Sequence, residues 1–277
     1  MDFITGEKFK ALADITYGDA GWNIGTGFDC DVVVFCETHK IDEMFRLPEF
    51  LEIGKVKLIT HNSDGCITTG STRSFDYNYH KDQIPPNVSV WYAQNLDVTN
   101  GGRLHPLPIG LENTKWHQGV KYVEIDFVRS MNIPKHKQLY LNCELSTNPV
   151  ERGDCVRILS RLPFTTYRTN KVSYSQYLRE MAQHIFVACP EGNGFDTHRM
   201  WEALYLRCIP VVKRRVFTER LSTHFPMVMV KDWREVTPQK LMQFFRNPNE
   251  RTRTMNNYQN SLNFEYWKQK ILKGEAI

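Results

Sequence analysis

Short runs of apolar, β-branched and aromatic residues recur along the chain and alternate with stretches of helical or loop-like pattern. The runs are continuously apolar, which is typical of strands in parallel sheets that are covered on both faces. The pattern predicts strands at residues 31–36, 57–61, 88–93 and 104–110, and a second series at 138–142, 164–167, 184–189, 209–212 and 227–230.

Helical patterns separate the strands of the second series, at residues 152–162, 173–183 and 197–207, with Ser173 placed to cap the middle helix. This β-α-β-α alternation indicates a Rossmann-like fold. We therefore expect an α/β protein of two Rossmann-like domains, at residues 1–135 and 136–259, with a cleft between them. A last helix within 260–277 is expected to pack back on the N-terminal domain.

Composition excludes several other classes. Of the 277 residues, 41% are hydrophobic and 24% charged, which favours a packed core over disorder. The net charge of +4 comes without a basic stripe, so we expect no nucleic-acid partner. The seven cysteines are irregularly spaced without a CxxC pair, which predicts neither disulfides nor a zinc site. No signal-peptide pattern and no apolar run of about 18 residues is visible, and we expect a soluble cytoplasmic protein without membrane insertion.

The segment at residues 186–204 combines a buried strand, a turn with two glycines and the start of a helix. Ligands of open parallel sheets lie beyond the carboxyl ends of the strands, and a helix N-terminus there favours a diphosphate. Arg199 can add a bidentate contact to phosphate, and Glu202, on the same helix face, can accept hydrogen bonds from ribose hydroxyls. The alternative is an ordinary surface ion pair between Arg199 and Glu202.

This segment resembles the signature of the exostosin-type glycosyltransferases, closely over residues 184–212 and loosely over the rest of the second half. The shared residues are Pro190, Gly192, Gly194, Arg199, Glu202, Ala203 and the run from Cys208 to Val212. The resemblance implies a GT-B fold, an inverting mechanism, a UDP-sugar donor held by the C-terminal half, and no need for a cofactor or metal ion. The chain is similar to the small soluble β-xylosyltransferases of chloroviruses, which would imply UDP-xylose as donor, a fucose-containing glycan as acceptor, and action in the host cytoplasm.

Further donor contacts are expected from position. Arg152 opens the helix after strand 138–142 and could reach the second phosphate, although a solvated arginine at a helix start is the simpler alternative. The donor-binding candidates are Arg152, Gly192, Gly194, Phe195, Thr197, Arg199 and Glu202, with Ser146, Tyr167 and Thr169 as weaker ones.

An inverting transfer needs a base that takes the proton of the acceptor hydroxyl. We expect it at the carboxyl end of a strand in the first half, where Asp64 follows strand 57–61. His61 and Glu112 are the other candidates, and an Asp followed by Gly is also a common turn signal. For the same positional reason, the acceptor candidates are Asn62, Trp91 and Asn95.

Two other functions remain open from the sequence. A carbohydrate-binding or sugar-nucleotide-binding protein could keep the fold without turnover. A metal-dependent GT-A transferase would use the DxD string of Asp29 and Asp31, but these residues precede a predicted strand, whereas the GT-A carboxylates follow one.

Overall fold

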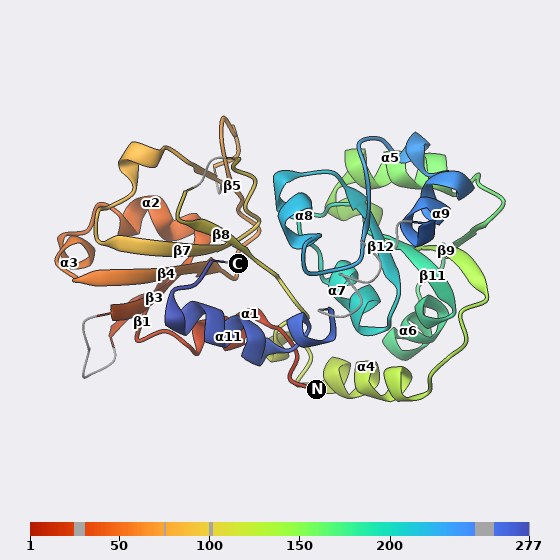
Figure 1. Cartoon of the computed structure of the whole chain (residues 1–277), viewed down its shortest axis with the longest axis horizontal. Helices are drawn as coiled ribbons and strands as arrows, with labels where there is room; N and C mark the ends of the chain where they lie inside the picture. The colour runs from red at the N-terminus through yellow and green to blue at the C-terminus, as the bar shows by residue number, and fades with distance from the viewer. Residues whose placement is uncertain (25–30, 75, 100–101, 247–257, 277) are drawn as a thin grey trace. The chain divides into compact units, whose positions relative to one another are not determined.

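The computed structural model describes residues 1–24, 31–74, 76–99, 102–246 and 258–276 (Figure 1). It confirms an α/β protein with parallel sheets. The chain divides into two compact units. The N-terminal unit comprises residues 2–109 and 263–277, and the C-terminal unit comprises Met1 and residues 110–262.

The sheet of the N-terminal unit has the strand order β2-β1-β3-β4-β7-β8 and is parallel except for the β1/β2 hairpin. Its strands are β1 (Ile15–Gly18), β2 (Gly21–Ile24), β3 (Asp31–Glu37), β4 (Lys55–His61), β7 (Val88–Gln94) and β8 (Leu104–Leu107); β5 (Ile67–Thr68) and β6 (Tyr77–Asn78) form a separate pair. The helices are α1 (Gly6–Lys10), α2 (Ile41–Met44), α3 (Pro48–Leu51) and α11 (Phe264–Lys273).

Both faces of this sheet are covered, which explains the continuous apolar runs. Alternate residues such as Leu58 and Trp91 belong to one buried cluster with Met44 of α2 and Phe50 of α3. On the other face, the ring of Phe9 in α1 contacts the ring of Phe264 at 5.2 Å. A parallel strand buried on both faces has no polar side to show in the sequence.

The C-terminal helix α11 is part of the N-terminal unit. The hydroxyl of Tyr92 on β7 donates to the carbonyl of Lys270 at 3.2 Å, and the ammonium of Lys57 on β4 donates to the carbonyl of Leu272 at 2.6 Å. These bonds join strands near the start of the chain to its last helix.

The C-terminal unit contains a parallel sheet of order β10-β9-β11-β12-β13. The strands are β9 (Lys137–Leu141), β10 (Thr165–Tyr167), β11 (His184–Ala188), β12 (Ile209–Lys213) and β13 (Val228–Val230). The helices are α4 (Val120–Ser130), α5 (Pro149–Leu159), α6 (Tyr174–Ala182), α7 (His198–Tyr205), α8 (Val216–Leu221) and α9 (Pro238–Arg246). Ser173 caps α6 as predicted, since its hydroxyl accepts from the amide of Gln176.

The boundary between the units falls at Ile109/Gly110, whereas the sequence suggested residues 135/136. The difference arises from α4, which contacts α6 and α7 of the C-terminal unit. Ile125 and Val128 are the buried residues of α4. The sequence of such a helix carries no signal for the later helices against which it packs.

The six cysteines of the described residues are all free. Among those residues, the structure contains no helix that is both long enough and apolar enough to cross a membrane.

Candidate functional site

Two loops meet at the carboxyl edge of the C-terminal sheet, one after β9 and one after β11. Asn148 joins them, because its side-chain amide donates to the carbonyl of Gly192 at 2.9 Å. The same side chain caps α5 by accepting from the amide of Glu151, and Pro149 occupies the first turn of that helix. The residue that starts α5 therefore also fixes the glycine turn before α7.

Arg152 lies in the first turns of α5 and is 6% exposed. Its Nε donates to the carbonyl of Glu191 at 3.0 Å, and its Nη1 donates to the carbonyl of Glu144 at 2.7 Å. The guanidinium is thus held between the two loops by backbone oxygens. It forms no ion pair with a carboxylate in the part of the chain that the structure describes.

Gly192 leaves room for this guanidinium. A Cβ on Gly192 would lie 2.9 Å from Nη2 of Arg152, closer than real Cβ contacts allow. The amide of Gly192 donates to the carbonyl of Gly194 at 3.1 Å, which closes the turn. The sequence suggested these glycines for contact with a ligand, and the structure adds a role for Gly192 in the placement of Arg152.

Arg199 belongs to the first turn of α7. Thr197 is the N-cap residue of this helix, with an extended backbone and no side-chain hydrogen bond to the first turn. The Nε of Arg199 is buried and has no hydrogen-bond partner among the described residues. Burial lowers the pKa of Arg199, but the nearby Tyr177, Cys189 and Glu202 more than offset this, so its pKa is raised and it stays cationic.

The two guanidiniums lie close enough to repel one another. Burial and then the charge of Arg199 lower the pKa of Arg152, which remains protonated because arginine titrates far above neutral pH. Buried charges are normally paired, since removing an ion from water without compensation is costly. This edge of the sheet therefore carries a local excess of positive charge that an anion can compensate.

Glu202 is buried, and its carboxylate accepts two tyrosine hydroxyls. Tyr174 donates to Oε1 and Tyr177 to Oε2, each at 2.8 Å. Burial and the Glu202 carboxylate raise the pKa of both phenols, so both are hydrogen-bond donors at neutral pH. These two tyrosines were not predicted from the sequence, although their spacing of three residues on one helix was a signal that they share a face.

Phe195 is half-buried and its ring is covered by a cation. The guanidinium of Arg215 lies 4.5 Å from the ring centroid and forms a bidentate pair with Glu191, at 2.8 and 2.9 Å. Arg215 is therefore in a direct ion pair with a carboxylate, whereas Arg152 and Arg199 form no such pair among the described residues.

The weaker donor candidates lie on the loops of the same edge. Ser146 is exposed and bonds to Glu144, and Thr169 is exposed with its hydroxyl 3.5 Å from Asn170. Tyr167 is the last residue of β10 and is half-buried, and burial raises its pKa. Each is accessible enough to contact a ligand at this edge.

The three base candidates differ in availability. Asp64 is exposed in the loop after β4. His61 is 1% exposed, and both ring nitrogens face backbone groups, with Nε2 3.0 Å from the carbonyl of Pro108 and Nδ1 accepting the Asn62 amide at 2.7 Å. Glu112 belongs to the C-terminal unit and pairs with Lys121 at 2.5 Å. Of the three, Asp64 is the exposed one, and the role of base stays a prediction for it.

Two acceptor candidates require correction. Trp91 is fully buried in the core of the N-terminal unit, where its ring contacts Phe45 and Tyr77 and its Nε1 donates to Thr60. Asn95 is 1% exposed. Both side chains are therefore buried within the unit. The sequence could not show this, because a position at a strand end does not reveal the direction of the side chain. Asn62 is half-buried and keeps a positive φ of 56°.

The DxD string is only partly described. Asp29 lies outside the described residues. Asp31 begins β3, at the amino end of the strand, and pairs with Lys55 at 3.3 Å and Lys57 at 3.7 Å. Its carboxylate is thus engaged by two cations, an arrangement that does not favour a donor-site metal ion there.

Comparisons of this chain with models of known protein families and with curated proteins found no match.

Proposed function

We propose that the chain is an inverting glycosyltransferase that binds the diphosphate of a UDP-sugar at the carboxyl edge of its C-terminal sheet. Arg152, Arg199 and the first amides of α7 contact the diphosphate oxygens, and Glu202 accepts the ribose hydroxyls. In this role the C-terminal unit stabilises the charge of the departing UDP, which is where transition-state stabilisation is most effective.

The observation that carries the proposal is that two neighbouring guanidiniums, those of Arg152 and Arg199, form no direct ion pair with a carboxylate among the described residues. Arg152 is held by carbonyls, and Arg199 has a buried Nε without a partner among the described residues. A diphosphate supplies a second negative charge beside the two guanidiniums and an acceptor oxygen for the Nε of Arg199. The N-terminus of α7, where Thr197 makes no side-chain cap, adds backbone amide donors that also favour an anion.

The acceptor and the reaction are proposed from the resemblance to exostosin-type enzymes. They comprise a GT-B arrangement of the two units, xylose as the transferred sugar and a fucose-containing glycan as acceptor. Asp64 takes the proton of the attacking hydroxyl, and the transfer needs no metal ion.

Calorimetric titration with UDP tests the donor site. The expected result is that Arg199→Met and Arg152→Met each weaken UDP binding about 10- to 100-fold, because each removes a charge-assisted contact. Arg157→Met is a matched control, since Arg157 lies on the same helix as Arg152 but is exposed and pairs with Asp154 at 2.9 Å. Wild-type affinity in both site variants would contradict the proposal.

A second assay separates an enzyme from a binding protein. Release of UDP from a UDP-sugar is measured with and without a glycan acceptor, and acceptor-dependent release is expected. A chain that binds UDP through Arg199 but never releases it from any donor would be a sugar-nucleotide-binding protein.

A further inference from the structure

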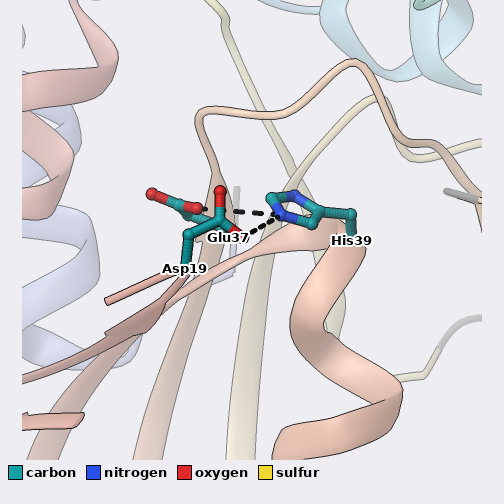
Figure 2. Close-up of side chains that lie close together, drawn as sticks. All are labelled: Asp19, Glu37 and His39. Atoms are coloured by element: carbon teal, nitrogen blue, oxygen red, sulfur yellow. Dashed lines mark hydrogen bonds and ion pairs between the residues drawn. The ribbon is translucent and has the colours of Figure 1, made fainter. Parts of the chain in front are cut away.

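Three potential metal ligands converge at the carboxyl edge of the N-terminal sheet, in the unit that does not contain the arginine pair. They are Asp19 from the β1/β2 turn, Glu37 at the end of β3, and His39 just after it (Figure 2). Their ligand atoms all lie within 4.8 Å of one another. Figure 2 shows the two carboxylates and the imidazole pointing toward a common space.

The imidazole is oriented for coordination. Nε2 of His39 lies 3.2 Å from Oδ1 of Asp19 and 3.9 Å from Oε2 of Glu37. The other ring nitrogen, Nδ1, lies 3.3 Å from the hydroxyl of Ser63. A histidine that binds a metal usually makes such a hydrogen bond through its second nitrogen, which fixes the ring.

The three groups need a proton or a metal ion between them. A lone pair on Nε2 facing two carboxylate oxygens is repulsive unless a proton or a metal ion lies between them. Separations of 3 to 4 Å are close to the distance between two ligands of one ion with bonds of about 2.0–2.2 Å.

The fold makes room for one of the carboxylates. A Cβ on Gly18 would lie 2.8 Å from the carboxyl carbon of Glu37 and 3.0–3.1 Å from its two oxygens. The glycine therefore lets this carboxylate lie directly against β1. Glu37 is held at the site by packing as well as by charge.

We propose that Asp19, Glu37 and His39 bind a divalent transition-metal ion of the Zn²⁺ type. One imidazole and two carboxylates suit such an ion, whereas Mg²⁺ and Ca²⁺ prefer oxygen ligands alone. The remaining coordination positions are filled by water, because Asp19 and His39 are accessible from solvent. The site belongs to a different unit from the donor site and does not depend on the proposed transfer reaction.

Two lysines compete with the ion. Lys40 lies 3.6 Å from Asp19, and Lys10 lies 3.9 Å from Glu37. Both lysine side chains are partly exposed, and ion pairs of this kind are weak. The lysines can therefore turn away when a metal ion binds, and removing Lys40 should strengthen binding.

Calorimetric titration of the dialysed full chain with Zn²⁺ tests the site, with Mg²⁺ as the comparison ion. We expect one Zn²⁺ per chain, lost or weakened at least about tenfold in His39→Gln and in Glu37→Gln. His136→Gln is the matched control, since His136 is an exposed histidine of the other unit. Lys40→Met is expected to bind Zn²⁺ several-fold more tightly than the wild type.

The proposal is overturned if the wild type takes up no Zn²⁺, or if His39→Gln and Glu37→Gln bind it as well as the wild type does. Weaker binding by Lys40→Met would also contradict it. UDP titration of the same variants distinguishes failure of one proposal from failure of the other. Loss of UDP binding with Zn²⁺ binding retained would concern the donor site only.

Discussion

The two units place chemically opposite groups at the same position of similar sheets. At the carboxyl edge of the C-terminal sheet, two arginines lie close together without carboxylate partners among the described residues. At the carboxyl edge of the N-terminal sheet, two carboxylates and an imidazole converge, with lysines beside them. The topology determines where a ligand can bind, and the charge balance at each edge determines which ligand it is.

The largest expected effect is on turnover. Asp64→Asn cannot accept a proton, so we expect kcat to fall about 100- to 10,000-fold while UDP affinity stays at the wild-type value. The measurement is the initial rate of acceptor-dependent UDP release. Asp82→Asn, at another exposed aspartate of the same unit, should retain activity.

One result would contradict the proposal that the base and the arginines belong to different units. If Glu112→Gln abolished turnover and Asp64→Asn did not, the base would belong to the same unit as the arginines. The proposed role of Asp64 would then be wrong.

A glycine substitution should affect only the carboxyl edge of the C-terminal sheet, where Arg152 and Arg199 lie (the arginine edge). In Gly192→Ala the new Cβ would meet Nη2 of Arg152 at 2.9 Å and displace the guanidinium, so UDP should bind about 10- to 100-fold more weakly. Gly153→Ala is the control, because a Cβ there has no neighbour within 4 Å. Equal UDP affinity in both variants would show that the position of Arg152 is irrelevant to binding.

The corresponding glycine substitution at the carboxyl edge of the N-terminal sheet should weaken Zn²⁺ binding and leave UDP binding unchanged. Gly18→Ala would bring a Cβ to 2.8 Å from the carboxyl carbon of Glu37, and Zn²⁺ affinity should fall about tenfold without a change in UDP affinity. Titration of both ligands into both glycine variants provides the measurement. Loss of the two affinities together in either variant would mean that the edges are not independent.

The smallest effect concerns stability. Burial lowers the pKa of His184, at the start of β11, from 6.5 to about 4. As the pH falls below 6.5, the unfolded chain binds a proton that the folded chain refuses until about pH 4, so the free energy of unfolding should decrease across this window by roughly 1–3 kcal/mol. Hydrogen exchange of the β9 and β11 amides, measured between pH 4 and 6.5, can follow this decrease in the free energy of unfolding.

A matched pair of variants sharpens this measurement. His184→Gln should flatten the pH dependence between pH 4 and 6.5, since it removes the group responsible. His136→Gln, at an exposed histidine, should leave the slope unchanged. An unaltered slope in His184→Gln would assign the pH dependence to other groups.

Much of the fold could be predicted because its strands are apolar on both faces. The runs at residues 31–36, 57–61 and 184–189 correspond to β3, β4 and β11. The β1/β2 hairpin was not predicted, since its strands are short and include Gly18 and Asn23. The helix α4 was not predicted, and its segment falls in the C-terminal unit because its partners, α6 and α7, lie far along the chain.

The chemistry of the sites was less accessible from the sequence. Arg199 and Glu202 follow a strand and a turn with two glycines, which made them candidates. The tyrosine partners of Glu202 are 25 and 28 residues away along the chain. The three proposed metal ligands come from different local structures. Glu37 stands 18 positions after Asp19, and no spacing rule connects them. Trp91 was misplaced because a strand alternates its side chains between two faces, and both faces here are buried.

Hydrogen exchange of the wild-type chain with and without UDP tests the central claim most directly. Bound UDP is expected to slow exchange in peptides that cover residues 142–152 and 189–199, the two loops that hold Arg152 and Arg199. Protection confined to the N-terminal unit, or none at saturating UDP, would contradict a diphosphate site at the arginine edge.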